Sequence, residues 1–424
     1  MRLGLILLAG CGPAVVEVLP VQGSALGGEV VTLRGARLPA EPEVRFGGAL
    51  AEATRVDRRT LEVVTPPGVA GVVDVTVAGR QDGTLEGGFT YVPLDLAFAE
   101  APAHYLPEPA GTTTAAVAGD LDGDGVAEVV LVQDGALSVW WNSGLGGFVE
   151  GLAPAVDAPV GGVAFLSEGR LFTCPAGEGD PLRLTWDGER WGPNGALPAS
   201  APCHGVRALT LAGEEVLAEL GDDGLRLRTA DSGPGADGWP TDVAVSGGAS
   251  DVVLLDDALV IGTLEGPLLT EAGPAGWREA AVGRLPASDC AVGAMDVLDV
   301  EGDGEAELAV ACADGQDRLY RGDGQGHYFE DSAASLPVDA AVGAALAHAD
   351  LDLDGLPELI VGNRGGVDRL YRGDGARFED WSARLSLTIA DTVAALPMDV
   401  DADGAVDLLL VDADGARLFV NVGE

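Results

Sequence analysis

Lysine is absent from this chain of 424 residues, so its basic residues, 24 in number, are all arginines. They are outnumbered by 68 acidic residues, and the formal net charge is −44. A field of that sign repels phosphate backbones and anionic lipid headgroups. The composition therefore argues against nucleic acid as a partner and against membrane binding through a basic surface.

Aromatic residues and long apolar runs are also scarce. Phe, Trp and Tyr make up 5% of the chain, although 47% of it is hydrophobic and 63 residues are glycine. No segment after the first eleven residues reaches the roughly 18 apolar residues that a membrane-spanning helix needs. Short runs of Ala, Val and Leu separated by glycine are typical of many short strands joined by turns. We therefore expect an all-β chain of two or three domains.

Four segments of nine residues share one spacing of acidic side chains. Each carries acids at its first, third, fifth and ninth positions and a glycine at the sixth. Hard cations such as Ca²⁺ take about six to eight oxygen ligands from flexible loops. We expect four structural calcium sites, in which these acids and the carbonyl at the seventh position are ligands. The predicted ligands are Asp120, Asp122, Asp124, Val126 and Glu128; Asp299, Glu301, Asp303, Glu305 and Glu307; Asp350, Asp352, Asp354, Leu356 and Glu358; and Asp399, Asp401, Asp403, Ala405 and Asp407.

The residues around these segments distinguish them from EF-hands and from plain acidic surface turns. Each segment leads into a short apolar run, which indicates a buried strand. EF-hands would need flanking helices and a glutamate at the twelfth position. Plain acidic surface turns are the alternative, although such turns have no need of one ligand spacing. Four calcium ions would add 4 × 2 = 8 charges to −44, so most of the acidity is solvated surface.

Residues 1–11 have the features of an export signal. Arg2 precedes an apolar run that ends at small residues. Leu8-Ala9-Gly10-Cys11 resembles the bacterial lipobox, in which the cysteine is lipidated and becomes the mature N-terminus. Gly12 lacks the aspartate that retains lipoproteins at the inner membrane, so the resemblance favours the outer membrane. Because the apolar run is short, an upstream start codon and a first strand of the next domain stay open as alternatives.

Residues 12–92 are expected to form one compact β domain. Valine-rich runs at 30–33, 44–46, 61–64 and 72–77 are predicted strands. The residues that separate and close them resemble, in order, an immunoglobulin-like IPT/TIG domain: Gly27-Gly28, Gly35, Phe46-Gly-Gly48, Thr65-Pro-Pro67 and Phe89-Thr-Tyr91. In that family the domain is a spacer or an interaction module, and the resemblance brings no catalytic residue.

Residues 93–424 are repetitive. The phrase Asp317–Gly324 recurs as Asp368–Gly375, and strands of the kind that precede an acidic loop return at intervals of about 44 to 51 residues. An aromatic residue opens one strand of each unit: Phe98, Phe148, Trp191, Trp239, Trp277, Phe329 and Phe378. Four strands fit each of seven units, which predicts a seven-bladed β-propeller. Because the last unit lacks its own aromatic strand, we expect the Phe98 strand to complete it and close the ring.

The acidic loops and repeats resemble the FG-GAP/VCBS family, known from integrin α-subunit propellers and bacterial surface proteins. In that family the aspartate-rich loop binds calcium, and this carries over to the four matching loops, in blades 1, 5, 6 and 7. The equivalent segments of blades 2 to 4 are short and lack ligands, so we expect them to bind no metal. These segments are 165–169, 211–215 and 254–257.

Cysteines 174, 203, 290 and 312 suggest two disulfides in an exported chain. None of their spacings fits a zinc site. Cys203 and Cys290 precede inner strands, whereas Cys174 and Cys312 end the strands that follow. Antiparallel neighbours place both kinds of position at one face, so we predict Cys290–Cys312 within blade 5 and Cys174–Cys203 across blades 2 and 3.

No catalytic constellation is found. The histidines, at 104, 204, 327 and 348, form no His-Glu-x-x-His motif, and there is no Gly-x-Ser-x-Gly elbow. His348 lies on an inner strand and is interpreted as a buried or channel-lining side chain. The Arg-Gly-Asp triplets 321–323 and 372–374 occupy equivalent repeat turns, so we interpret them as structural and not as integrin ligands.

The sequence thus predicts a non-catalytic, calcium-stabilised binding or adhesion protein, lipid-anchored in the cell envelope and monomeric. Its propeller would recognise a protein or glycan ligand. A carbohydrate-active enzyme or lectin, with a site near Trp140, Trp141 or Trp381, is one alternative. An envelope-complex scaffold that docks through blades 2 to 4 is another.

Overall fold

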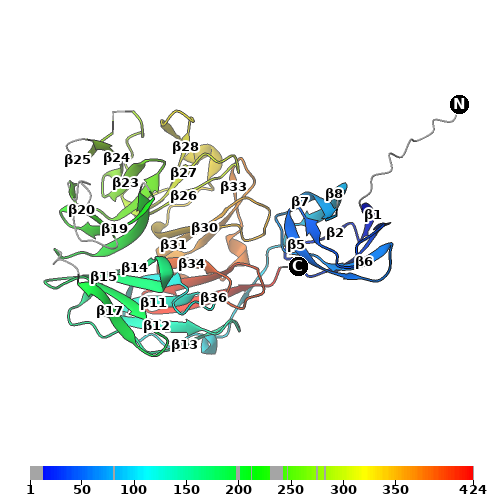
Figure 1. The fold of residues 1–424 in the computed structure, drawn as a ribbon. Coiled ribbons are helices and arrows are strands. Elements are labelled where there is room, and N and C mark those ends of the chain that lie inside the picture. The colour runs from blue at the N-terminus through cyan, green and yellow to red at the C-terminus, as the bar shows by residue number, and fades with distance from the viewer. Residues whose placement is uncertain are drawn as a thin grey trace.

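The computed structural model describes residues 13–79, 82–196, 201–211, 213–229, 242–245, 247–273, 276–280 and 283–423. The chain forms a small β-sandwich followed by a seven-bladed β-propeller, which lie side by side in Figure 1. The all-β prediction and the predicted order of the two folds are therefore confirmed. The predicted leader at 1–11, which includes Cys11, lies outside the described residues, as do Gly12 and Trp239.

The sandwich consists of two sheets with the orders β1-β3-β6-β5 and β4-β7-β8-β2, joined by pairing of β4 with β5. The core between them contains Phe46, Phe89 and Tyr91, whose rings meet edge to face. The Tyr91 hydroxyl donates a hydrogen bond to the Pro66 carbonyl at 2.6 Å. The strands are β1 (Ala14–Leu19), β2 (Gln22–Ser24), β3 (Val30–Ala36), β4 (Val44–Phe46), β5 (Ala49–Arg55), β6 (Thr60–Val64), β7 (Gly71–Val77) and β8 (Gly83–Val92).

Each of the first five blades is a separate antiparallel sheet of four strands in sequence order. Blade 1 contains β10 (Thr113–Gly119), β11 (Glu128–Gln133), β12 (Ala136–Asn142) and β13 (Phe148–Glu150), and blade 2 contains β14 (Val160–Leu166), β15 (Arg170–Pro175), β16 (Leu182–Trp186) and β17 (Trp191–Ala196). Blade 3 contains β18 (Gly205–Leu211), β19 (Glu214–Gly221), β20 (Gly224–Thr229) and β21 (Asp242–Ala244), and blade 4 contains β22 (Asp251–Leu255), β23 (Ala258–Thr263), β24 (Gly266–Gly273) and β25 (Gly276–Glu279). Blade 5 contains β26 (Val292–Leu298), β27 (Glu307–Cys312), β28 (Arg318–Gly322) and β29 (Tyr328–Glu330).

Blades 6 and 7 are joined into one larger sheet because β31 and β34 are long enough to pair beyond their own blades. Blade 6 contains β30 (Val342–Ala349), β31 (Glu358–Val367), β32 (Arg369–Gly373) and β33 (Phe378–Asp380). Blade 7 contains β34 (Ile389–Met398), β35 (Asp407–Asp412), β36 (Gly415–Asn421) and β9 (Phe98–Glu100). Short helical turns lie between strands: η1 (Ala103–Tyr105), η2 (Ser167–Gly169), α1 (Ser332–Ser335) and η3 (Ser382–Arg384).

The ring closes as predicted, by the strand that begins at Phe98. β9 pairs antiparallel with β36, so Phe98 lies opposite Asn421 and the first strand after the sandwich completes the last blade. The inner strands contact one another in succession around the ring, and β34 of blade 7 contacts β10 of blade 1. Closure leaves only short outer strands as edges.

The short apolar runs that follow the acidic loops form the second strands of their blades. Every residue of β11, β27 and β35 is buried, and each strand packs between the neighbouring blades. Leu409 and Val411 of β35, for example, share one hydrophobic cluster with Val129 and Leu131 of β11. The blade interfaces therefore form the propeller core, and both predicted disulfides, Cys174–Cys203 and Cys290–Cys312, are formed in the structure.

Candidate metal centres

The four acidic loops occupy one place in the fold, between the inner strand and the second strand of a blade. They join β10 to β11, β26 to β27, β30 to β31 and β34 to β35. The acid at the ninth position is always the first residue of the second strand. That strand is buried, and its first residue is therefore at most 2% exposed: Glu128, Glu307, Glu358 and Asp407.

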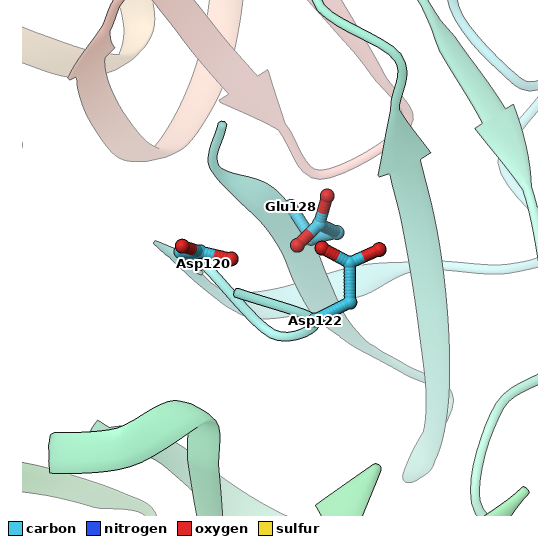
Figure 2. A group of neighbouring side chains, drawn as sticks. All are labelled: Asp120, Asp122 and Glu128. Carbon is cyan, nitrogen blue, oxygen red and sulfur yellow. The ribbon is translucent and has the colours of Figure 1, made fainter. Parts of the chain in front are cut away.

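In the first loop three carboxylates converge (Figure 2). One oxygen from each of Asp120, Asp122 and Glu128 lies within 4.8 Å of the other two. The carboxylate of Asp120 also accepts hydrogen bonds from the backbone N–H groups of Gly123 at 2.6 Å and of Gly125 at 3.0 Å. Gly125 has a φ of 92°, a conformation that glycine adopts without strain. The local sequence thus folds the loop around the carboxylate of Asp120.

Glu128 is the most informative side chain of this loop. Its Oε2 accepts a hydrogen bond from the backbone N–H of Leu121 at 2.8 Å, whereas Oε1 is buried and has no hydrogen-bond partner. Burial, reinforced by the charges of Asp122 and Asp124, raises the pKa of Glu128 to about 7. A buried carboxylate oxygen without a partner is costly, and a bound cation would satisfy it.

The third and fourth loops repeat this arrangement. Their converging carboxylates are Asp350, Asp352 and Glu358 in one loop and Asp399, Asp401 and Asp407 in the other. Glu358 Oε1 and Asp401 Oδ1 are buried without a hydrogen-bond partner. Burial, followed by the charges of the neighbouring acids, raises the pKa of Glu358 to about 8 and that of Asp407 to about 7.

The acid at the fifth position is not among the converging groups, and one of its oxygens accepts a hydrogen bond from the backbone N–H of the residue two places on. These pairs, at 2.8 to 2.9 Å, are Asp124 with Val126, Asp303 with Glu305, Asp354 with Leu356 and Asp403 with Ala405. The fifth acid therefore shapes the turn that presents the carbonyl at the seventh position.

The second loop differs from the prediction. Its acids form no comparable three-carboxylate group among the described residues. Glu301 stands at the third position, where the other loops have aspartate, and its Oε1 lies 2.6 Å from Nη1 of Arg321. In this loop the third acid is therefore paired with an arginine. Burial still raises the pKa of Glu307 to about 7.

Three of the loops therefore have a donor set that fits a hard divalent cation. The converging atoms are all carboxylate oxygens, which calcium and magnesium prefer to nitrogen or sulfur ligands. The buried unpaired oxygens of Glu128, Glu358 and Asp401 point to a missing positive partner. In these loops the first, third and ninth side chains would hold the ion.

The predicted bare segments of blades 2 and 3 are cross-linked by protein groups. Glu215 accepts hydrogen bonds from the backbone N–H of Ser167 at 2.5 Å and from Nη2 of Arg170 at 3.0 Å. In blade 4, the corresponding turn is a tight hairpin at Asp256, which has a φ of 53°. Between blades 2 and 3 an ion pair takes the place that an acidic loop has in blades 1, 5, 6 and 7.

The Arg-Gly-Asp triplets do not present their arginines to solvent. The Arg321 side chain is 7% exposed, and its Nε lies 2.9 Å from Oδ2 of Asp331. The Arg372 side chain is 24% exposed and contacts Asp352 and Asp354 of the third loop. Sequence reasoning missed these contacts, although the repeated Leu-Tyr-Arg phrase of blades 5 and 6 was the signal for them.

The histidines and the singled-out tryptophans have structural partners. Nδ1 of His348 lies 2.7 Å from Oδ2 of Asp296 on the neighbouring inner strand. Burial lowers the pKa of His348, but the hydrogen bond with Asp296 outweighs it and raises the pKa above its usual value. Trp140 is 1% exposed, whereas Trp381 is contacted on its ring by two arginines. Trp141 meets Trp186 at 5.0 Å between ring centroids, and Trp186 meets Trp191 at 5.5 Å.

Family comparisons identify two parts of the chain. Residues 13–92 match the IPT/TIG domain, and residues 299–361 and 350–410 match the FG-GAP-like repeat. These matches bear out the resemblance for the sandwich and for blades 5 to 7. A sequence search of curated proteins finds no significant match. No described helix is long and apolar enough to cross a membrane.

Solved structures share the fold at low sequence identity. A protein of unknown function from Bacteroides thetaiotaomicron is 12% identical, with a TM-score of 0.50, and the alignment covers 96% of this chain and 98% of that one. The WD40 β-propeller domain of Doa1 is 11% identical with a TM-score of 0.52, covering 77% and 97%. BBS1N, in its complex with ARL6DN, is 14% identical with a TM-score of 0.52, covering 77% and 97%. The chain thus joins an IPT/TIG domain to a β-propeller that carries FG-GAP-like repeats.

Proposed function

We propose that this chain is a calcium-stabilised, non-catalytic binding protein whose propeller recognises a protein or glycan ligand. The buried oxygens of Glu128, Glu358 and Asp401 that have no hydrogen-bond partner support the calcium part of the proposal, because each lies in a cluster of converging carboxylates. The ions are structural in this proposal. They tie the inner strand of a blade to its buried second strand.

The protein would act outside the cytoplasm, anchored by a lipid on Cys11, with the outer membrane as the favoured location. Two disulfides support an oxidising compartment, because thiols are kept reduced in the cytosol. The acidic surface supports neither nucleic acid nor anionic lipid as a ligand. The IPT/TIG domain would act as the spacer between the anchor and the propeller.

A glycan is favoured as ligand by one feature, the row formed by Trp141, Trp186 and Trp191. The three rings are only partly buried and come from the outer strands of blades 1 and 2. Aromatic rings in such a row offer flat apolar faces beside polar groups, the surface on which sugar rings stack. A lectin-like site on these two blades, specific for glycans, is therefore our second candidate. A carbohydrate-active enzyme would in addition need carboxylates placed around the three rings.

A binding array tests the proposal. Residues 12–424 would be applied to glycans and matrix proteins in calcium and in EDTA, with folding verified by circular dichroism in both. We expect a specific ligand in calcium and its loss in EDTA. Replacement of Trp186 by alanine should abolish a glycan signal and spare a protein signal, whereas alanine at the exposed Leu264 serves as the control. A blank array from folded protein would contradict ligand recognition and favour the envelope scaffold.

A further inference from the structure

Two of the four acidic loops already contain a cation supplied by the protein. Arg372 of β32 places Nε 2.7 Å from Oδ2 of Asp352 and Nη2 2.6 Å from Oδ2 of Asp354. Its planar group thus bridges the third and fifth acids of the third loop, a geometry that guanidinium provides and ammonium does not. In the second loop Arg321 contacts one acid only, with Nη1 2.6 Å from Oε1 of Glu301.

The first and fourth loops lack this arginine because of the residue at one position in the third strand. Strand pairing aligns Tyr371 opposite Leu359 in blade 6 and Phe419 opposite Leu408 in blade 7, so Val420 is the counterpart of Arg372. The same alignment makes Trp141 its counterpart in blade 1, where Trp140 lies opposite Val129. Neither valine nor tryptophan can neutralise a carboxylate.

The division is seen at the third position, although Glu358 Oε1, at the ninth position of the third loop, is also buried without a hydrogen-bond partner. Asp401 of the fourth loop has a buried Oδ1 without a hydrogen-bond partner. Asp352, its counterpart in the third loop, is 1% exposed, and Arg372 satisfies its second oxygen. A buried charge needs a partner, and here that partner is either an arginine or an ion.

Arg372 is itself held in place. Its guanidinium carbon lies 5.1 Å from the ring centroid of Trp381, and the ring also contacts Arg384. Arg321 is fixed more firmly, because it also donates to the carbonyl of Ala376 at 2.6 Å and contacts Asp331. Both arginines are therefore preorganised beside their loops and need no rearrangement to neutralise them.

We propose that Arg321 and Arg372 act as tethered cations in the second and third loops, so that calcium binds tightly only at the first and fourth loops. This inference rests on the proposed calcium binding. Calcium enters the second and third loops only by displacing an arginine from a ligand carboxylate. The charge of a loop tunes its calcium affinity. We therefore expect the second and third loops to need a calcium concentration at least about tenfold higher than the first and fourth loops for half occupancy.

Equilibrium dialysis of the chelator-treated full chain against radioactive calcium tests the inference. The wild type should take up two ions in a tight class and further ions in a weak class. Arg372→Gln should move one site into the tight class, and Val420→Arg should remove one tight site. Arg377→Gln is the matched control, because this arginine of the same hairpin is 61% exposed and its partners, Asp374 and Glu379, lie outside the loop.

The outcomes separate this inference from the proposed function. Four equal sites in the wild type, or an uptake curve that Arg372→Gln leaves unchanged, would overturn the tethered cations and leave calcium binding intact. No uptake by any of the four proteins would overturn both. The dialysis is paired with circular dichroism of each variant, and Val420→Arg decides the question if Arg372→Gln fails to fold.

Discussion

At the scale of single residues, the closing acid of each loop differs from the other carboxylates. Glu128 accepts a backbone hydrogen bond with one oxygen and leaves the other buried without a partner. Its pKa of about 7 means that the folded, metal-free chain holds a proton there that the unfolded chain, with an ordinary pKa of 4.5, has already lost near neutral pH. If calcium binds as we propose, proton and calcium compete for the carboxylate of Glu128.

This competition predicts the pH dependence of stability. The folded-state pKa values of Glu128, Glu307 and Asp407 are raised to about 7, so the folded chain binds more protons than the unfolded chain between about pH 4.5 and 7. Stability of the metal-free protein should then fall as pH rises through this window. Calcium should stabilise more at pH 8 than at pH 5.5, with affinity falling about tenfold per pH unit for each displaced proton. Thermal melts in calcium and in EDTA at both pH values measure this, and a calcium shift that is equal at both would contradict it.

The variant Glu128→Gln separates the effect of this side chain on calcium binding from its effect on the stability of the metal-free protein. The amide oxygen can still accept the hydrogen bond from Leu121, while the buried charge disappears, so the metal-free variant should be at least as stable as the wild type. Its stabilisation by calcium should drop by the contribution of one site, about 1.4 kcal/mol at ten times Kd. Denaturant titrations with and without calcium measure both effects. Glu150→Gln, an exposed change in the same blade, should leave both unchanged, and a full calcium response in Glu128→Gln would exclude Glu128 as a ligand.

Sequence could predict the converging carboxylates because their spacing is local. Asp120, Asp122 and Glu128 lie within nine residues, and the glycine turn folds them together without help from the rest of the chain. Arg372 and Asp352 are 20 residues apart, and their contact depends on the register between β31 and β32. Periodicity does not encode that register, so the loops looked equivalent in the sequence and are not.

At the scale of elements, closure of the ring is the most consequential feature. The segment before β9 inserts Leu96, which is 0% exposed, into a cluster with Leu351, Ile360 and Phe419. Repeat counting predicted β9 because one outer strand was missing from the last unit. It could not predict that β31 and β34 extend to pair with each other, because that contact depends on strand length beyond the repeat.

Leu96→Ala tests how far this segment stabilises the propeller. Removing a fully buried leucine side chain leaves a cavity between blades 6 and 7 and should lower the free energy of unfolding by about 3 kcal/mol. Urea denaturation followed by tryptophan fluorescence measures it. Leu387→Ala removes the same atoms from a side chain that is 69% exposed and should cost less than about 0.5 kcal/mol. Equal stabilities of the two variants would mean that the closing segment does not contribute to the core.

At the scale of the whole molecule, the sandwich and the linker that follows it are hydrogen-bonded to an acidic loop of the propeller. The backbone N–H of Ala70 donates to the carbonyl of Leu353 at 3.0 Å, and that of Leu94 donates to the carbonyl of Asp352 at 2.7 Å. Both acceptors lie in the third loop, the loop whose carboxylates Arg372 neutralises. The arrangement of the two domains therefore depends on a loop whose acids are already paired with a protein cation.

The joint between the domains should thus withstand calcium removal. Small-angle X-ray scattering of the wild type is expected to give the same radius of gyration in calcium and in EDTA, because Arg372 still holds Asp352 and hence the carbonyl that Leu94 contacts. Arg372→Gln should expand by several ångström in EDTA and return to the wild-type value in calcium, since the ion is then the only group left to neutralise the loop. Arg377→Gln should behave as the wild type. Expansion of the wild type itself in EDTA would show that calcium, and not the arginine, holds the joint.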